Sequence, residues 1–264
     1  MNIVVCIKQV PGTTTVDIDP ETGALKRDGV ASKMNPYDLY ALETALRLKE
    51  QHGGEISVIT MGPPQAQAII KEAYMMGADS GYILTDKRFA GSDVLATSYT
   101  LSQGIKKIGG ADIIICGKQT TDGDTAQVGA AIAEWLNIPH VTWVRSIEAI
   151  TYSGMVVEKN MAESFETVKV KFPCLITVDK DIYMPRLPSY KKMKETKDKA
   201  ITYLSLDDLE DKDDKKYGLN GSPTQVERIF QPESNDEHII WQDGKENCAE
   251  KIFTVLAKNK YIKV

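Results

Sequence analysis

The stretch DIIICGKQTTDGDTAQVGAAIAEWL, residues Asp112–Leu136, decides the fold that we expect for this chain. Its first part, Asp112–Cys116, is an apolar run typical of a strand buried on both faces of a parallel sheet. The pattern that follows predicts a helix over Thr125–Leu136. A buried strand joined to a helix by a short polar loop is the repeating unit of an α/β protein.

The residues that precede this stretch repeat the unit. Strands are expected at Ile3–Ile7, Glu55–Met61 and Gly81–Leu84. Helices are expected from Pro36 to the Gly53-Gly54 pair, over Gln65–Met76 and over Asp93–Ile108. The first helix has a strong start, because Asn35 can cap it, Pro36 suits its first position and Asp38 lies in its first turn. This alternation predicts a doubly wound parallel sheet, to which Thr14–Gly29 adds a β-hairpin.

The alternation ends after Pro139. A second hairpin is expected over Met155–Lys159 and Phe165–Lys171, followed by a strand at Leu175–Val178. Beyond residue 180 the chain is polar, with lysines over 191–199, acids over 207–214 and a last helix at about Glu246–Lys258. So polar a segment cannot build its own core, and it is either disordered or wrapped around another protein; wrapping is favoured. The chain thus divides into an α/β domain (1–180), a loop segment (181–200) and an extended C-terminal arm (201–264).

Composition narrows the function. The formal net charge is -5 and the pI about 5.4, which disfavours a nucleic-acid partner because phosphate binding needs concentrated positive charge. No apolar run is long enough to span a membrane, and Met1–Val10 does not read as a signal peptide, so the protein is expected in the cytoplasm. The four cysteines and three histidines have no ligand spacing, so no metal is expected and the cysteines are expected to be free buried thiols.

The loop after Cys116 is the best candidate site, because ligands of open parallel sheets bind at the carboxyl ends of the strands. Backbone N–H groups and the helix dipole would there suit a pyrophosphate. Asp124 or Thr125 can cap the helix, Gly123 permits a tight turn and Gln127 can reach a ligand; Asp122 and Asp124 repel phosphate, so they tie the loop together, cap, or bind ribose. An ordinary capped turn explains the spacing equally well. No side chain is predicted to act as acid, base or nucleophile.

Several stretches together resemble the beta subunit of electron transfer flavoproteins over essentially the whole chain. They are Cys6–Pro11, Met34–Asp38, Ala73–Asp79, Gly117–Gly129, Met184–Pro188 and Gly218–Pro223. One such motif would be weak evidence, but this many in the same order is specific. The resemblance implies an adenine-nucleotide alpha-hydrolase-like fold and a heterodimer with a larger alpha subunit, on which the arm 201–264 would pack. It also implies an electron carrier that oxidises NADH only as part of a complex.

The resemblance also assigns residues to sites. The nucleotide would be lined by Cys6, Lys8, Asn35, Asp38, Met61, Gly117, Gln119, Thr120, Thr121, Asp122, Gly123, Asp124, Thr125, Gln127 and Val128. Leu187 matches the leucine by which the family's partner-recognition loop, here 181–200, anchors in a flavin dehydrogenase of the acyl-CoA or lactate type. Two departures are visible: Ala130 replaces a usual proline, and 183–190 match the recognition loop only loosely, which leaves the partner open.

Two branches of the family differ in their beta-subunit ligand. The respiratory branch holds structural AMP. The electron-bifurcating branch holds FAD, which takes a hydride from NADH and sends one electron to ferredoxin or flavodoxin and the other, through the alpha-subunit FAD, to the partner dehydrogenase. Asp122–Gly129 and Pro11–Gly29 resemble the bifurcating branch, and Gly123 would let the backbone approach a bulky ligand. Bifurcation is therefore favoured over AMP; a non-redox adenine-nucleotide-binding regulatory domain is the alternative from another class.

Overall fold

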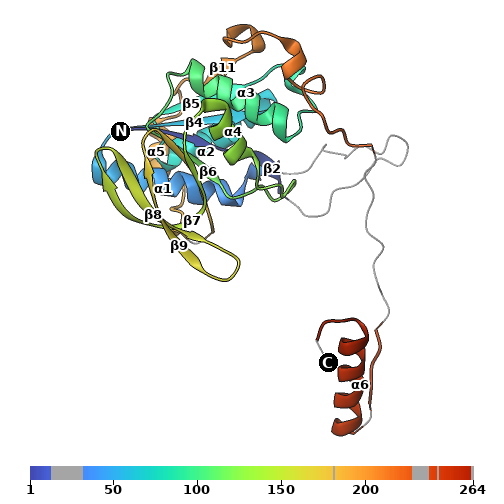
Figure 1. The fold of residues 1–264 in the computed structure, drawn as a ribbon. Coiled ribbons are helices and arrows are strands. Elements are labelled where there is room, and N and C mark those ends of the chain that lie inside the picture. The colour runs from blue at the N-terminus through green and yellow to red at the C-terminus, as the bar shows by residue number, and fades with distance from the viewer. Residues whose placement is uncertain (13–31, 181, 228–237, 243, 263–264) are drawn as a thin grey trace. The chain divides into compact units, whose positions relative to one another are not determined.

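The computed structural model describes residues 1–12, 32–180, 182–227, 238–242 and 244–262 (Figure 1). The hairpin expected over Thr14–Gly29 lies outside the described residues. The chain forms two compact units, Met1–Arg228 and Ile229–Val264. Each unit is described by itself below.

The first unit is built on a sheet with the strand order β11-β5-β4-β1-β6-β10-β7-β8-β9. Its parallel centre consists of β1 (Asn2–Cys6), β4 (Glu55–Met61), β5 (Ser80–Leu84), β6 (Ile113–Gly117) and β10 (Cys174–Val178). From β1 the chain first adds β4 and β5 on one side and then β6 to β10 on the other, before a last short strand returns to the first side. The strand order therefore reverses between β1 and β6, and the predicted doubly wound α/β fold is confirmed.

Helices cover both faces of this sheet (Figure 1). They are α1 (Pro36–His52), α2 (Gln67–Met76), α3 (Val94–Lys107) and α4 (Val128–Leu136), with single 3₁₀ turns at Pro64–Ala66 and Lys87–Phe89. Ala41 of α1 and Ile70 of α2 share one apolar core with Ile3 and Val5 of β1. Residues of α3 and α4 share a second core with the alternate β1 residues Val4 and Cys6. The two cores follow from the alternation of side chains along each strand.

The sheet is extended by β7 (His140–Thr151), β8 (Gly154–Asn160) and β9 (Phe165–Lys171). The hairpin expected from β8 and β9 is confirmed, but β7 was not predicted. This strand runs parallel to β10 and antiparallel to β8, with bulges in both pairings. Its burial does not alternate regularly, because each bulge shifts the side-chain phase, and the period-2 signal is lost.

Much of the polar segment after residue 181 packs on the first unit. A short helix α5 (Tyr190–Glu195) contacts α2, and β11 (Thr202–Leu204) pairs parallel to β5 at the sheet edge. Two further 3₁₀ turns follow at Leu206–Asp208 and Asp214–Lys216. A few apolar residues spaced along the segment, namely Leu204, Leu206, Leu209 and Tyr217, are fully or almost fully buried. A small separate sheet pairs β2 (Gln9–Pro11) with β3 (Ser32–Met34).

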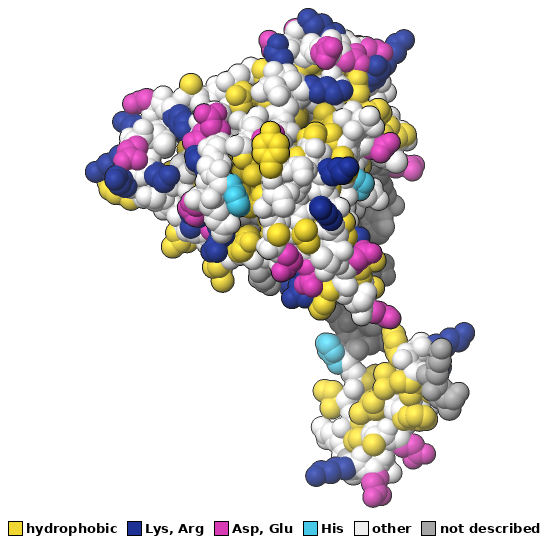
Figure 2. All heavy atoms as spheres, turned by 60° about the vertical axis from the view of Figure 1, so that its left-hand side comes forward, with side chains coloured by type: hydrophobic (Ala, Val, Ile, Leu, Met, Phe, Trp, Pro, Cys, Tyr) yellow, Lys and Arg dark blue, Asp and Glu magenta, His cyan; other side chains and the backbone are white. Residues whose placement is uncertain are grey.

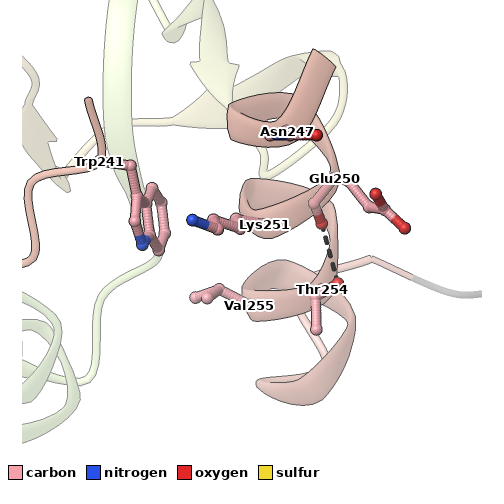
Figure 3. Close-up of a pocket in the computed structure, with 6 residues that line it drawn as sticks. All are labelled: Trp241, Asn247, Glu250, Lys251, Thr254 and Val255. Carbon is pink, nitrogen blue, oxygen red and sulfur yellow. Dashed lines mark hydrogen bonds between the residues drawn. The ribbon is translucent and has the colours of Figure 1, made fainter. Parts of the chain in front are cut away.

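The second unit contains the predicted last helix, α6 (Lys245–Lys258). Trp241 lies beside it and lines a shallow pocket of about 370 Å³ together with Lys251 and Val255 (Figure 3). No side chain of α6 is buried, and apolar side chains gather on the surface of this unit (Figure 2). Across the described parts of the chain, no helix has the length and apolar character needed to cross a bilayer.

Candidate functional site

The candidate site lies where β1, β6 and β10 end. Cys6 of β1 is level with Cys116 of β6, and Thr177 of β10 is level with the same cysteine. This edge is the switch point of the sheet, where open α/β proteins bind ligands. The loop 117–127 leaves β6 here and leads into α4.

Asn35 is far from this loop in the sequence but binds it directly. It is fully buried at the N-cap position of α1, but its side chain does not cap that helix. Instead its Nδ2 donates to the carbonyl of Gln119 at 2.9 Å, and the backbone N–H of Thr121 donates to its Oδ1 at 3.2 Å. The prediction that Asn35 caps the helix is therefore wrong. Its buried amide instead forms hydrogen bonds with backbone groups of the loop, which would otherwise need water as a partner.

Lys8 ties the loop to the end of β1. Its Nζ donates to both carboxylate oxygens of Asp122, at 2.8 and 2.7 Å. Partial burial disfavours the charge on Asp122, but the hydrogen bonds and charge of Lys8 outweigh it and hold the pKa of that carboxyl below its usual range. Of the roles expected for Asp122, tying the loop together is the one that the structure supports.

Asp38 is the buried acid of the site. The backbone N–H of Lys8 donates to its Oδ2 at 2.7 Å. Burial raises the pKa of Asp38 to about 7, although hydrogen bonds from Asn35, Lys8 and Gly117 favour the charged form. Gly117 has to be glycine, because a Cβ there would lie 2.5 Å from Asp38 Oδ1 and 2.7 Å from the backbone carbon of Tyr37. Three chain segments thus converge on this one carboxyl.

Within the loop the expected cap is absent. The Asp124 side chain accepts from Gln119 Nε2 at 2.9 Å, and its backbone N–H donates to the Thr120 carbonyl at 3.0 Å. Asp124 and Ala126 have positive φ angles of 49° and 53°, which no helix accommodates. The helix α4 therefore begins at Val128 rather than Thr125, and no side chain caps it, so capping by Asp124 or Thr125 is wrong.

This geometry leaves the start of α4 without a side-chain cap. Ala126 is left-handed, and Gln127 after it is right-handed, with φ −110° and ψ −26°. Such a change of hand turns consecutive N–H groups toward one side, and the uncapped first turn of α4 adds more. Gly123, by contrast, is not left-handed and would place a Cβ no closer than 3.5 Å to Thr120, so the turn itself does not require glycine.

A second cluster at this edge was not predicted. Lys118 Nζ lies 3.2 Å from Asp179 Oδ2 and 4.6 Å from the centre of the Trp143 ring. Asp179 also accepts from Asn160 Nδ2 at 2.6 Å. Trp143 has φ 61°, a rare conformation for a bulky residue, and its N–H donates to Thr177 Oγ1 at 3.0 Å. Only the position of Asp179 directly after a buried strand hinted at this cluster.

The remaining predicted residues are less closely connected. Met61 ends β4, on the far side of β1 from β6, and Cys6 ends β1 with its side chain buried. Thr121, Thr125 and Gln127 are exposed on the loop, Thr120 is half-buried with its hydroxyl bonded to Asp122, and Val128 starts α4. Leu187 lies outside this site, in a segment beside α1. Cys6, Cys116 and Cys174 are free and buried, as expected, while Cys248 is free but only half-buried.

The fold and the candidate site first define the class of protein. It is a doubly wound α/β protein whose switch-point loop is held by Lys8 and Asn35 and leads into a helix without a side-chain cap. The chain belongs to the electron transfer flavoprotein family, beta-subunit type. The electron transfer flavoprotein domain matches residues 22–209. The chain is 48% identical to the electron transfer flavoprotein subunit beta of Thermoanaerobacterium thermosaccharolyticum, over 96% of this chain and 98% of that protein. Beta subunits of this family pair with an alpha subunit.

Two further relatives are similar over most of their length. One is the caffeyl-CoA reductase-Etf complex subunit CarD of Acetobacterium woodii, 45% identical over 88% of each chain. The other is protein FixA of Azorhizobium caulinodans, 42% identical over 94% of this chain and 90% of that protein. Membership of the family implies association with a flavin or AMP.

Proposed function

We propose that this chain is the beta subunit of an electron-bifurcating flavoprotein and holds FAD at the loop 117–128. The single observation that carries the ligand class is the start of α4: an uncapped helix that follows a change of backbone hand between Ala126 and Gln127. Free N–H groups in that arrangement suit the pyrophosphate of a dinucleotide. A bound FAD would supply hydride acceptance from NADH and one-electron transfer to ferredoxin or flavodoxin and to the alpha-subunit FAD.

The residues of the chain would position the cofactor and tune its properties, and none is proposed to act as acid, base or nucleophile. Asn35 and Lys8 fix the loop from two directions, through the bonds to Gln119, Thr121 and Asp122. Thr125 is exposed on the loop and is the free hydroxyl proposed to hydrogen-bond the cofactor. Lys8, also a candidate for that role, is already paired with Asp122, so its main role is to hold the loop.

FAD is favoured over AMP by Gly123. Within the described chain nothing requires glycine at this position, because its φ is not left-handed and a Cβ would meet only an ordinary contact. A close approach by a large ligand is the remaining physical reason for a missing side chain. The resemblance of residues 122–129 to the bifurcating branch supports the same ligand.

The partner is proposed to be a flavin dehydrogenase. One relative is a subunit of a caffeyl-CoA reductase-Etf complex, which supports an acyl-CoA type for this chain as well. A lactate-type dehydrogenase is the second candidate, because residues 183–190 match the recognition loop only loosely.

Counting the nucleotides in the purified heterodimer tests the proposal. Two FAD per heterodimer, with NADH-dependent reduction of ferredoxin or flavodoxin, are expected. One FAD and one AMP would overturn bifurcation and leave an AMP-holding carrier. Absence of flavin and of a copurifying alpha subunit would favour the regulatory domain instead.

Gly123→Ala tests the location of the site. The added methyl meets no obstacle in the chain, so the unfolding temperature without cofactor should stay the same while bound FAD falls at least several-fold. Gly244→Ala is the matched control, because a Cβ there meets nothing within 4 Å, just as a Cβ at residue 123 meets only an ordinary contact of 3.5 Å with Thr120, and because Gly244 lies in the second unit. Equal FAD content in both variants would place the ligand elsewhere.

A further inference from the structure

We propose that Asp38 is a positioning residue that takes up a proton from water when an anionic dinucleotide binds the loop 117–128. The proton turns the carboxylate into the neutral acid, so the negative charge of the ligand is not added to a buried negative charge. The inference rests on the proposed function, since the anion would be the pyrophosphate of FAD. It adds a dependence of that site on pH.

Asp38 is connected to the loop directly and through Asn35. It accepts hydrogen bonds from Gly117, the first residue of the loop, and from Asn35 at the start of its own helix. Asn35 in turn donates to the Gln119 carbonyl at 2.9 Å and accepts from the Thr121 N–H at 3.2 Å. A change in the charge of Asp38 therefore acts on several places along the loop.

Lys8 makes a third connection without neutralising Asp38. Its backbone N–H donates to Asp38 Oδ2 at 2.7 Å, but its Nζ donates to both carboxylate oxygens of Asp122, at 2.8 and 2.7 Å. Within the described chain, Asp38 is thus a carboxyl that accepts N–H groups and forms no ion pair of its own. A buried acid in this situation loses or gains its proton more readily than a paired one.

A second buried acid at the same edge shows the difference that a cation makes. Asp38 is 5% and Asp179 6% exposed. Burial disfavours the charge of both, but in Asp179 the hydrogen bond from Asn160 and the pair with Lys118 outweigh it and lower the pKa. In Asp38 burial outweighs the hydrogen bonds and raises the pKa to about 7. Near neutral pH, a modest change in local charge therefore decides whether Asp38 is ionised.

A pyrophosphate in the loop is such a change. It would bring two negative charges to a loop that starts in contact with Asp38, since a Cβ on Gly117 would lie 2.5 Å from Asp38 Oδ1. A like charge nearby favours the neutral form of a carboxyl. The pyrophosphate of FAD is a diester with no proton to gain near neutral pH, so the protein has to take up the proton.

The titratable neighbours of Asp38 do not compete for this proton. On β6, the hydrogen bond with Cys6 of β1 and burial hold the pKa of the Cys116 thiol well above its usual range, so this thiol is already protonated. On the loop, Asp122 is partly buried, but Lys8 holds the pKa of its carboxyl below the usual range. The Lys8 ammonium already carries its protons as the donor to Asp122. Asp38 is the group that remains.

The test is a calorimetric titration of FAD into the heterodimer after the nucleotide of this chain has been removed, with the alpha-subunit FAD in place. Two buffers with different enthalpies of ionisation allow the protons taken up to be counted. At about pH 8 we expect at least about 0.5 proton per FAD, and close to none at about pH 6, where Asp38 is already protonated. The Kd for FAD should accordingly rise from about pH 7 to about pH 8, by about tenfold at most.

Three variants locate the proton. Asp38→Asn should abolish the uptake and make the Kd independent of pH. Asp179→Asn is the matched control, because it removes an equally buried acid that has a cation, and it should keep the uptake. Lys8→Met removes the nearest cation, so Asp38 binds its proton more tightly and the uptake should be largest at a higher pH. This shift is measurable even where Asp38→Asn does not fold.

The outcomes separate this inference from the proposed function. Binding of FAD to the wild type without proton uptake would overturn the inference alone, and so would undiminished uptake in Asp38→Asn or an unshifted profile in Lys8→Met. Failure of the wild type to bind FAD would overturn the proposed function instead. The same titration with AMP then decides about Asp38, because the phosphate of AMP contributes equally in wild type and Asp38→Asn. Equal uptake in those two proteins would overturn the role of Asp38 as well.

Discussion

At the residue scale, the site depends on buried polar side chains that reach across the chain. Asn35 and Asp38 sit at the start of one helix, yet they bind the loop after β6 and the end of β1. Each side chain forms hydrogen bonds with backbone groups that would otherwise need water as their partner. A short polar loop can therefore keep one geometry without a disulfide or a metal.

Asp38 should make the stability of the protein depend on pH. Its pKa is about 7 in the folded chain against an ordinary 3.8, so the folded state binds a proton that the unfolded state has lost. This contribution to stability is present at low pH and falls as the pH rises from about 4 to about 7. The charged group that acts on it is Lys8, which is paired with Asp122, and the thiol of Cys116 interacts with it as well.

Asp38→Asn removes this titration. The wild-type unfolding temperature should fall relative to the variant between about pH 4 and about pH 7, measured at constant ionic strength in the heterodimer. Loss of a hydrogen-bond acceptor adds an offset that does not change with pH. Parallel curves for the two proteins would show that Asp38 is already ionised throughout this range.

Asp122→Ala should release the loop without unfolding the protein. Its pair with Lys8 is part-exposed, and pairs of that kind contribute about 0.2–1 kcal/mol, so the unfolding temperature should barely move. Nucleotide retained after gel filtration should fall, because one of the two attachments of the loop is lost. Asp207→Ala, which breaks the exposed pair with Arg88, is the control. Unchanged nucleotide content in Asp122→Ala would remove this residue from the site.

At the scale of elements, β7 is joined to the site edge by an unusual backbone. Trp143 has a positive φ, and its N–H has left the ladder for the hydroxyl of Thr177 on β10. The ring then lies under Lys118, the second residue of the segment that leaves β6. The bulge thus places an aromatic face and the Lys118–Asp179 pair beside the loop.

Thr177→Val should destabilise the first unit by about 0.5–1.5 kcal/mol, because the backbone N–H of Trp143 loses its acceptor, the hydroxyl of the buried Thr177, while the side-chain shape is kept. The midpoint of chemical unfolding measures this. Thr151→Val, at an exposed threonine that donates to Gly154, should change the midpoint by less than about 0.5 kcal/mol. Equal midpoints would mean that water replaces the hydroxyl.

At the scale of the whole molecule, the chain has one unit with a large core and one without. The first unit buries two apolar clusters on the two faces of its sheet. The second has no buried side chain on its only described helix, and Ile239, Ile240 and Phe253 are all more than half exposed. We propose that this unit is buried by another protein, namely the alpha subunit.

A chain that ends at residue 227 should test this division. The first unit should keep its unfolding transition, since its core lies within Met1–Arg228. Copurification with the alpha subunit should fall strongly. Phe253→Glu in the full-length chain should act in the same direction, whereas Lys258→Glu at the polar end of α6 should not. Undiminished pairing of the shortened chain would show that the first unit alone carries the interface.

The sequence by itself determined the class of the fold and predicted the place of the candidate site. Apolar runs and helical spacing are local signals, so β1, β4, β6, α1 and α2 were predicted close to their bounds. The loop after β6 was found because the carboxyl end of a buried strand is itself a local feature. The family was recognised from several motifs in the same order, because no single motif was specific enough.

Only the tertiary structure decided how the loop is held. The bond from Asn35 to Gln119 spans 84 residues, and the pair Lys8–Asp122 spans 114, so no local pattern contains them. From the sequence, both Asn35 and Asp124 are predicted to cap a helix. In the structure, the Asn35 amide instead bonds the distant loop, and the Asp124 carboxylate accepts a hydrogen bond from Gln119. The periodicity of one segment reports which face it buries, whereas the partners of a buried polar group depend on which segments the fold brings together.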